Sequence, residues 1–406
     1  MHLEGFRAIL ERRLRPESRR PVAVAFSGGG DSVALLLAAS DWAKAARRDL
    51  LVLTVDHRLQ TDSGAWTLAC AATAARLGLA FQALAWTDEK PATGLPSAAR
   101  AARHRLLVDA ARAAGASVIL MGHTADDILE ARLMRARGST TPEPREWSPS
   151  PVWPEGRGVF LLRPLLGFRR VEIRDWLTAR GEQWIDDPAN ESPLSLRAQA
   201  RRDIAGAGTG PIPTSETTGA EVLARACRQD AAAGLHAPRG AVATAPPGVA
   251  ARFLSAACLC AAGTSRPPPR EAVMRLAERL AGRDGFTTTL AGARIEADGD
   301  EVLFLREAGE AARGGLRLLI LMAGETGVWD GRFEITAGRA MEVRSASGLR
   351  QSLSPTDQDA LTALPARARD TVPVIVEEDG PRLAEATPLA LDRLHAACGV
   401  VELEPA

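Results

Sequence analysis

The chain has 406 residues, of which 46% are hydrophobic and 25% charged, so it is predicted to form two or three globular domains and not a disordered chain. Basic and acidic residues number 50 each, so the formal net charge of +0 gives no sign of a nucleic-acid partner, and any RNA-binding surface must be local. Five cysteines, with no paired spacing beyond Cys258 and Cys260, argue against a disulfide framework and indicate a reducing compartment.

The N-terminal segment is predicted to be an amphipathic helix. Residues 1–20 carry Glu4, Glu11 and Glu17 and lack the apolar core of a signal peptide. The longest apolar runs, such as LRLLILMAG at 316–324, are shorter than a bilayer span. We therefore expect a cytoplasmic protein without a membrane segment.

Strands and helices alternate along the first half of the chain. Short apolar runs predict buried strands at 21–26, 50–57, 79–86 and 117–123. Longer segments between and after them predict helices at about 33–46, 66–77, 97–116 and 124–137. This alternation is typical of an α/β domain with a parallel sheet that is covered on both faces and binds ligands at the carboxyl ends of its strands.

The rest of the chain divides at loops rich in proline, serine and glycine. Residues 138–156 are predicted to be a long loop, after which VFLLRPLL resumes the sheet and RRVEIRDWLTARG forms a helix. A linker at 205–220 marks a domain boundary, followed by helices near 216–236, 248–261 and 268–282 and a strand-rich stretch at 287–305. We expect three domains: a nucleotide-binding domain at 1–207, a mainly helical domain at 216–310 and a small α/β domain at 315–406.

The stretch SGGGDS, between the first strand and the first long helix, predicts a pyrophosphate cradle. A Walker-type loop has a lysine where this chain has Asp31, and a dinucleotide fingerprint has a third glycine that is missing here. What remains are backbone amides that can approach an anion, two hydroxyls and a helix N-terminus. The residues of this cradle are Ser27, Gly28, Gly29, Gly30, Asp31 and Ser32.

Other polar residues follow the neighbouring strands. Asp56 and His57 end the second strand, and residues 123–127 follow the fourth, so they should meet the cradle at one edge of the sheet. Asp127 and Glu130 are one helical turn apart, and both carboxylates can point the same way. By the same spacing argument, two pairs of arginines each share a helix face: Arg100 with Arg103, and Arg197 with Arg201.

Six motifs carry a resemblance to a known family. SGGGDS is similar to the signature of the PP-loop (N-type) ATP pyrophosphatases, which cleave ATP to AMP and pyrophosphate. Within that superfamily, residues 21–204 resemble the tRNA(Ile)-lysidine synthases. The motifs occur in the order of that family: SGGGDS at 27–32, VDHRLQ at 55–60, AARAARH at 98–104, GHTADDILEA at 122–131, RPLL at 163–166 and DDPANESPLSLRAQAR at 186–201.

The resemblance implies a fold, a reaction and a set of roles. The fold would be adenine nucleotide alpha-hydrolase-like, and the enzyme would use ATP and Mg²⁺ to adenylate the wobble cytidine of the isoleucine tRNA with a CAU anticodon. Free L-lysine would then displace AMP. The catalytic residues would be Asp31, Ser32 and Asp127. ATP would be held by the cradle with Asp56, His57, Arg100 and Arg103, lysine by Asp127 and Glu130, and the tRNA or phosphates by Arg163, Arg197 and Arg201.

The chain departs from the family at four positions, and other functions stay open at this point. His104, Ile128, Ala131 and Ala198 stand where the family has tyrosine, glutamine, threonine and asparagine. A PP-loop tRNA sulfur transferase needs a cysteine nucleophile or an iron–sulfur cluster, and residues 1–204 contain only Cys70. A ligase for a small metabolite would not need the domains after the linker. A tRNA-binding module with a vestigial ATP site is the third alternative.

Overall fold

The computed structural model describes residues 1–406 except 140, 186–195, 207–218 and 378. The chain forms two compact units. The first comprises Met1–Glu216 together with Val401–Ala406, and the second is Thr217–Val400. In the described part of the chain, no helix is long and apolar enough to cross a membrane.

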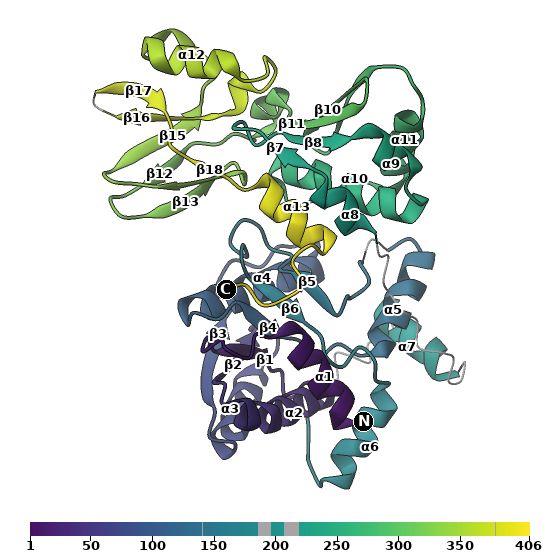
Figure 1. The fold of residues 1–406 in the computed structure, drawn as a ribbon. Coiled ribbons are helices and arrows are strands. Elements are labelled where there is room, and N and C mark those ends of the chain that lie inside the picture. Colours follow the sequence, from purple (N-terminus) through teal and green to yellow (C-terminus); the bar gives the residue numbers. More distant parts are fainter. Residues whose placement is uncertain (140, 186–195, 207–218, 378) are drawn as a thin grey trace. The chain divides into compact units, whose positions relative to one another are not determined.

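The first unit is built on a six-stranded sheet with the order β3-β2-β1-β4-β6-β5 (Figure 1). Its strands are β1 Val22–Ala25, β2 Leu50–Asp56, β3 Ala80–Ala85, β4 Val118–Leu120, β5 Trp147–Pro149 and β6 Phe160–Leu162. All neighbours are parallel except β5, which runs antiparallel to β6. The predicted parallel α/β fold is therefore confirmed.

One element of the sheet lies where a loop was predicted. Residues 147–149, inside the expected loop 138–156, form the edge strand β5. The Trp147 ring stacks on Phe160 of β6, with ring centroids 4.7 Å apart. The prediction of a continuous loop was wrong here because this packing against β6 outweighs the surrounding prolines and serines.

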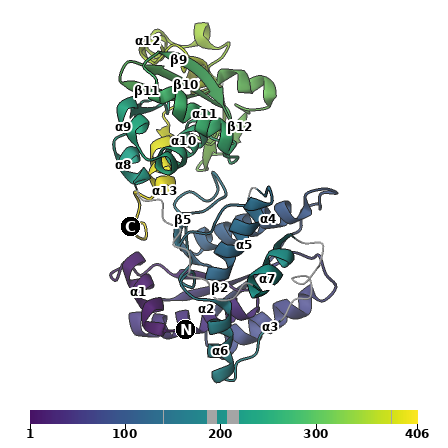
Figure 2. The same cartoon turned by 90° about the vertical axis from the view of Figure 1, so that its right-hand side faces the viewer.

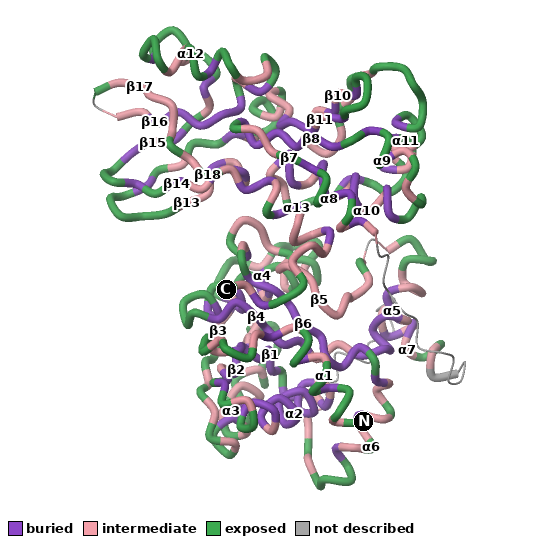
Figure 3. Tube along the Cα trace, viewed as in Figure 1, coloured by how far each residue is buried: buried purple, intermediate pink, exposed green. Residues whose placement is uncertain are grey.

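Helices cover both faces of the sheet (Figure 2). They are α1 Leu3–Arg13, α2 Gly30–Ala46, α3 Ser63–Arg76, α4 Leu95–Ala113, α5 Ala125–Ala136, α6 Arg170–Ala179 and α7 Leu196–Gly206. Phe6, Val33, Cys70 and Ile173, from α1, α2, α3 and α6, share one hydrophobic cluster with the sheet, whereas Leu107 of α4 belongs to a second cluster. Helix α2 is buried along most of its length (Figure 3), so its N-terminus is held firmly at the end of β1.

The segment 401–406 packs in the first unit through a buried ion pair. Glu404 is 1% exposed and accepts hydrogen bonds from both terminal nitrogens of Arg48, at 2.8 Å and 3.2 Å. The same carboxylate accepts from the Arg15 amide and the Ser18 hydroxyl, each at 3.1 Å. The Glu404 amide donates to the Arg13 carbonyl at 2.8 Å. Residues 401–406, which the sequence places in the predicted C-terminal domain, thus complete the first unit.

The second unit contains three sheets. The five-stranded one has the order β7-β8-β11-β10-β9, and the two smaller ones are β12-β15-β16-β17 and β13-β14-β18. The strands are β7 Arg228–Gln229, β8 Leu235–Pro238, β9 Phe286–Leu290, β10 Ala293–Asp298, β11 Glu301–Arg306, β12 Leu319–Leu321, β13 Thr326–Trp329, β14 Phe333–Thr336, β15 Met341–Ser345, β16 Pro373–Glu377, β17 Gly380–Leu383 and β18 Thr387–Pro388. The helices are α8 Ala220–Arg225, α9 Arg239–Thr244, α10 Pro247–Ala262, α11 Arg270–Ala281, α12 Pro355–Ala363 and α13 Ala390–Cys398.

One hydrophobic cluster runs through this unit, from Ala220 to Cys398, and includes residues on both sides of the boundary predicted near residue 310. The helices expected near 248–261 and 268–282 and the strands expected at 287–305 are present as α10, α11 and β9–β11. The linker expected at 205–220 falls largely on residues outside the described part of the chain.

The helix predicted near 216–236 was wrong beyond Arg225. The chain turns instead at Asp230, whose Oδ1 accepts from the amides of Ala232 and Gly234 at 2.9 Å and 2.8 Å. This turn lets β8 pair with β11. The alanine-rich sequence favours a helix locally, but the sheet pairing overrides that propensity.

Residues of the stretch GVWDGRF at 327–333 take part in a buried charge network. Asp330 accepts from Arg306 at 2.9 Å and 3.0 Å and from Arg332 at 2.9 Å, and Arg332 is fully buried. The two buried guanidiniums share this one carboxylate, and Arg332 also donates to the backbone carbonyls of Ala232 and Thr371, so the network has a structural role inside the second unit.

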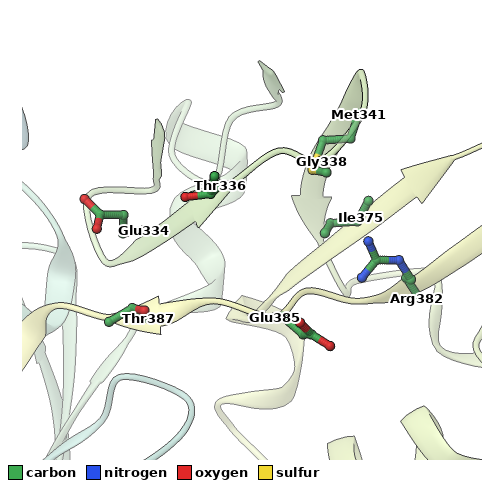
Figure 4. Close-up of a pocket in the computed structure, with 8 residues that line it drawn as sticks. All are labelled: Glu334, Thr336, Gly338, Met341, Ile375, Arg382, Glu385 and Thr387. Carbon is green, nitrogen blue, oxygen red and sulfur yellow. The ribbon is translucent and has the colours of Figure 1, made fainter. Parts of the chain in front are cut away.

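A polar pocket of about 400 Å³ lies in the second unit (Figure 4). The cradle residues lie in the first unit. Glu334, Glu385 and Arg382 line the pocket beside Met341 and Ile375. Arg382 is paired with Glu377 at 3.4 Å. Two carboxylates against one already paired guanidinium give the pocket no excess positive charge, so it carries no role in the chemistry below.

The buried His236 of β8 predicts a pH-dependent stability of the second unit. Its ring nitrogens lie 3.0 Å from Asp230 and 2.9 Å from Glu301, and both can donate only in the imidazolium form. The hydrogen bond to Asp230, helped by Glu301 and opposed by burial and Arg228, raises the pKa of His236. The stabilisation is therefore fully present below about pH 6.5, the ordinary histidine pKa, and is lost as the pH rises through the raised value.

We expect the urea midpoint of the second unit to fall as the pH is raised, and the fall to be smaller in His236→Gln. Pulse proteolysis in urea, with fragments assigned to the two units by mass spectrometry, measures this directly. A midpoint that rises with pH, or an equal fall in the variant, would contradict the assignment.

Candidate active site

The cradle has the geometry that its sequence predicts. After β1 the chain turns at Gly28, which has a φ of 77°, and Gly29 caps helix α2. The Ser32 hydroxyl donates to the Gly29 carbonyl at 2.8 Å and accepts from the Ser27 amide and hydroxyl, each at 3.3 Å. The amides at the start of α2 therefore point toward the end of β1, where an anion is favoured by the helix dipole.

Close packing requires glycine at Gly28 in this loop. A Cβ on Gly28 would lie 2.7 Å from the Ile185 side chain, and the Ile185 amide donates to the Gly28 carbonyl at 2.9 Å. Gly122, after β4, faces the backbone of Asp31, which a Cβ at Gly122 would approach to 3.2 Å. The loop is thus fixed from two sides by elements that are distant in sequence.

Asp31 is joined to the carboxylates of α5 by Arg170, a residue to which sequence analysis gave no role. Arg170 Nε donates to Asp31 at 3.1 Å and its Nη1 to Glu130 at 3.0 Å, while Nη2 lies 3.7 Å from Asp127. The other Asp31 oxygen, Oδ1, is buried and has no hydrogen-bond partner among the described residues. Burial raises the pKa of Asp31, and Arg170 opposes that shift.

Asp127 caps its own helix and also pairs with arginine. Its Oδ2 accepts from the Thr124 amide at 2.7 Å and from the Thr124 hydroxyl at 3.0 Å, and its Oδ1 pairs with Arg197. Burial would raise the pKa of Asp127, but His123, Arg197 and Arg170 hold it at about 2. Asp127 is therefore a stable anion at neutral pH.

Glu130 is 1% exposed and is surrounded by guanidiniums. Besides Arg170 it accepts from Arg197 at 2.7 Å and from Arg201 at 2.9 Å. The prediction that Arg197 and Arg201 share a helix face is confirmed, and that face contacts α5. Their predicted contacts to phosphate or tRNA stay a prediction, as do the lysine contacts of Asp127 and Glu130.

Arginines without counterions gather beside these groups. In the described part of the chain, Arg100 and Arg103 of α4 make no hydrogen bond or ion pair. Burial and the neighbouring Arg100 and Arg197 lower the pKa of Arg103 to about 10. At the end of β6, burial and Arg100 lower the pKa of Arg163 to about 9, and Arg163 donates to His123 at 3.1 Å. Such crowding of like charges is relieved by a bound anion.

His57 and Asp56 complete this edge of the sheet. The His57 ring meets Trp86 edge-on, with centroids 6.1 Å apart, and its Nδ1 is buried without a partner among the described residues. Burial and Arg103 lower the pKa of His57, so the ring is neutral at pH 7. Asp56 accepts from the Arg58 amide at 2.8 Å. Asp56 and His57 thus lie at the carboxyl end of β2, which runs parallel to β1 beside it.

Comparison with known proteins places this site in a family. The PP-loop domain model matches residues 4–207. Over 397 residues the chain is 50% identical to the tRNA(Ile)-lysidine synthase of Caulobacter vibrioides, covering 97% of this chain and 93% of that protein. The chain belongs to the tRNA(Ile)-lysidine synthase family. The family members of Hyphomonas neptunium and Rhizobium meliloti are 37% and 33% identical, over 71% and 90% of this chain and 82% and 84% of their own lengths.

The four departures from the lysidine synthase pattern are buried side chains. His104, Ile128, Ala131 and Ala198 are each less than 5% exposed. Burial and the nearby Arg103 and Arg100 lower the pKa of His104 to about 2, so it adds no charge to the site. These positions shape the packing behind the site. The first part of the sixth motif, residues 186–195, lies outside the described residues.

Cys70, the cysteine considered for a sulfur transferase, is buried in α3. Its side chain is 1% exposed, and burial raises the pKa of its thiol. Such a thiol is not poised as a nucleophile, in keeping with membership of the lysidine synthase family.

Four polar residues next to the site were not predicted from the sequence: Asp126, Arg169, Arg170 and Arg174. Asp126 accepts from Arg169 at 3.0 Å and from the Arg170 amide at 2.6 Å, so it fastens the start of α6 to α5. The Arg174 side chain covers Gly30. The available signal was the pair Arg169 and Arg170, separated from the RPLL motif by Gly167 and Phe168, with Arg174 one helical turn later.

Proposed function

We propose that this chain joins free L-lysine to C2 of the wobble cytidine in the isoleucine tRNA with a CAU anticodon. ATP activates the cytidine by adenylation, pyrophosphate leaves, and the lysine amine then displaces AMP. The observation that carries the proposal is the presence of two opposite charge clusters at one sheet edge: Arg100 and Arg103, which form no ion pair with any described residue, and the buried carboxylates Asp127 and Glu130. The first suits phosphates and the second an ammonium group.

In the first step the cradle holds the leaving pyrophosphate. Its negative charge develops at the N-terminus of α2, where the backbone amides and the Ser27 and Ser32 hydroxyls are already oriented. Arg100 and Arg103 supply positive charge, since neither forms an ion pair with a carboxylate of the described chain. Arg163, also crowded by like charges, would contact a phosphate of ATP or of the tRNA in our proposal.

Mg²⁺ fits beside Asp31. The buried Oδ1 of Asp31 lacks a partner, and no group of three or more metal-binding side chains occurs among the described residues. A single carboxylate together with substrate phosphates is the usual way in which proteins hold Mg²⁺. When bound, the ion would neutralise charge on the phosphates.

In the second step lysine meets Asp127 and Glu130. In the structure these carboxylates are balanced by Arg170, Arg197 and Arg201, so the ammonium of lysine must replace part of these contacts. With a pKa of about 2, Asp127 holds a cation better than it takes up a proton. Its role in our proposal is therefore to bind and orient the amine.

Asp127→Asn is expected to raise the lysine KM by about tenfold or more, because a hydrogen bond to a charged group is worth ~1.5–3 kcal/mol. At saturating lysine the ATP KM should change little, since the cradle lies at the start of α2. Steady-state AMP release at varied lysine and varied ATP measures both. Asp203→Asn, which removes an exposed carboxylate of α7, is the matched control. An unchanged lysine dependence would remove Asp127 from the lysine site.

The proposed function is tested by incubating the full chain with ATP, Mg²⁺, labelled lysine and the transcript of an isoleucine tRNA with a CAU anticodon. Lysine incorporation in step with AMP release is the expected result. AMP release without lysine transfer would retain the PP-loop chemistry but point to another nucleophile. Binding of ATP and tRNA with neither product would favour a binding module.

A further inference from the structure

We propose that Arg170 couples the binding of ATP to the binding of lysine, so that each ligand strengthens the binding of the other. The inference rests on the proposed function, because it takes Asp31 as part of the ATP site and Asp127 with Glu130 as the lysine site. Arg170 would act as a positioning residue between them.

Among the described contacts, Arg170 alone reaches both sites. Its three side-chain nitrogens face three different carboxylates: Nε faces Asp31, Nη1 faces Glu130 and Nη2 faces Asp127. Within the part of the chain that the structure describes, the ion pairs of Arg197 and Arg201 are with the α5 carboxylates alone. The planar fork of a guanidinium allows this sharing, which a point-like ammonium does not.

The charges of the network are balanced without ligands. Three carboxylates, Asp31, Asp127 and Glu130, face three guanidiniums, Arg170, Arg197 and Arg201, and the Arg170 side chain is only 22% exposed. A ligand that adds charge at one end must therefore redistribute these contacts.

The backbone of Arg170 is fixed, so its side chain is the part that moves when a ligand binds. The Arg170 amide donates to Asp126 at 2.6 Å, and the neighbouring Arg169 guanidinium holds the same carboxylate. ATP phosphates at the cradle draw the guanidinium toward Asp31, which leaves Asp127 and Glu130 short of one cation. The ammonium of lysine then binds with less competition. By thermodynamic linkage, lysine strengthens ATP binding by the same factor.

The test is calorimetric titration of the full chain with L-lysine, with and without Mg²⁺ and an ATP analogue whose α–β bridging oxygen is replaced by methylene. In the unmodified chain the analogue should strengthen lysine binding by about 5–150-fold, the usual range of coupling between sites. In Arg170→Gln this factor should fall to about 1, while lysine affinity without nucleotide stays equal or increases because a competing cation is gone.

Two further variants distinguish a coupling role of Arg170 from a purely structural role. Arg180→Gln removes a guanidinium at the C-terminal end of α6, which pairs with Asp41 at 3.6 Å, and should keep the coupling factor of the unmodified chain. Arg170→Lys keeps the positive charge but lacks the planar guanidinium fork. Its coupling factor should lie between those of the unmodified chain and Arg170→Gln. A merely structural Arg170 predicts weaker lysine binding without nucleotide and a lower melting temperature in Arg170→Gln.

The proposal is overturned if Arg170→Gln and Arg170→Lys retain the factor of the unmodified chain, or if the unmodified chain binds both ligands independently. Failure of the unmodified chain to bind lysine or the analogue at all is a different result, because it overturns the proposed function together with the coupling.

Discussion

Asp31→Asn is expected to abolish AMP formation, with a loss of at least about 100-fold in the rate, the scale found when one oriented electrostatic group is removed from an active site. Asparagine has nearly the same shape but carries no charge, so the cradle loses its anionic oxygen and Arg170 loses one of its three carboxylates. AMP release with saturating ATP, lysine and tRNA measures the effect.

The control for this variant lies on the same helix. Asp41 is half-exposed near the other end of α2 and makes only a 3.6 Å pair with Arg180, so Asp41→Asn should leave the rate within twofold or so, as for most surface substitutions. Thermal melting of both variants shows whether the fold is retained. Normal ATP turnover by a folded Asp31→Asn protein would remove Asp31 from the catalytic group.

Glu404→Ala is expected to lower the free energy of unfolding of the first unit by about 3–5 kcal/mol, the usual cost of removing one partner of a buried ion pair. Without the carboxylate, the Arg48 guanidinium stays buried and loses two hydrogen bonds. Urea unfolding followed by tryptophan fluorescence is suitable. Trp147 donates to the Val401 carbonyl at 2.7 Å and thus reports on this segment.

Two comparisons make this result specific. Glu17→Ala removes an exposed glutamate that lies 3.6 Å from Arg15 and should change stability by less than about 1 kcal/mol. Replacing both members of the pair, as in Arg48→Met with Glu404→Met, should recover most of the loss, because no buried charge then remains. A loss below about 1 kcal/mol for Glu404→Ala would mean that the segment contributes little to the fold.

Features that depend on neighbouring residues could be predicted from the sequence. The strand, glycine turn and helix around SGGGDS follow from local apolar pattern and glycine conformations, and the structure has them as β1, Gly28 and α2. The parallel sheet followed from the alternation of elements. Asp56 and His57 were placed correctly because parallel strands end at one edge.

Features that depend on contacts between residues distant in the chain could not be predicted from the sequence. Arg170 contacts Asp31 across 139 positions, and Glu404 contacts Arg48 across 356. Helical spacing gave Arg197 and Arg201 a common face but not the carboxylates that occupy it. The segment after Arg225 has the composition of a helix, and only its pairing with β11 makes it a strand.

The buried pair of Arg48 and Glu404 also sets an order of assembly during synthesis. The first unit leaves the ribosome before the second, yet residues 401–406 that complete it are made after the whole of Thr217–Val400. Until Glu404 arrives, Arg48 lacks its carboxylate partner, so a nascent or interrupted chain carries a weakened catalytic unit. The first unit, which binds ATP, therefore reaches its full stability only after the second unit has been synthesised.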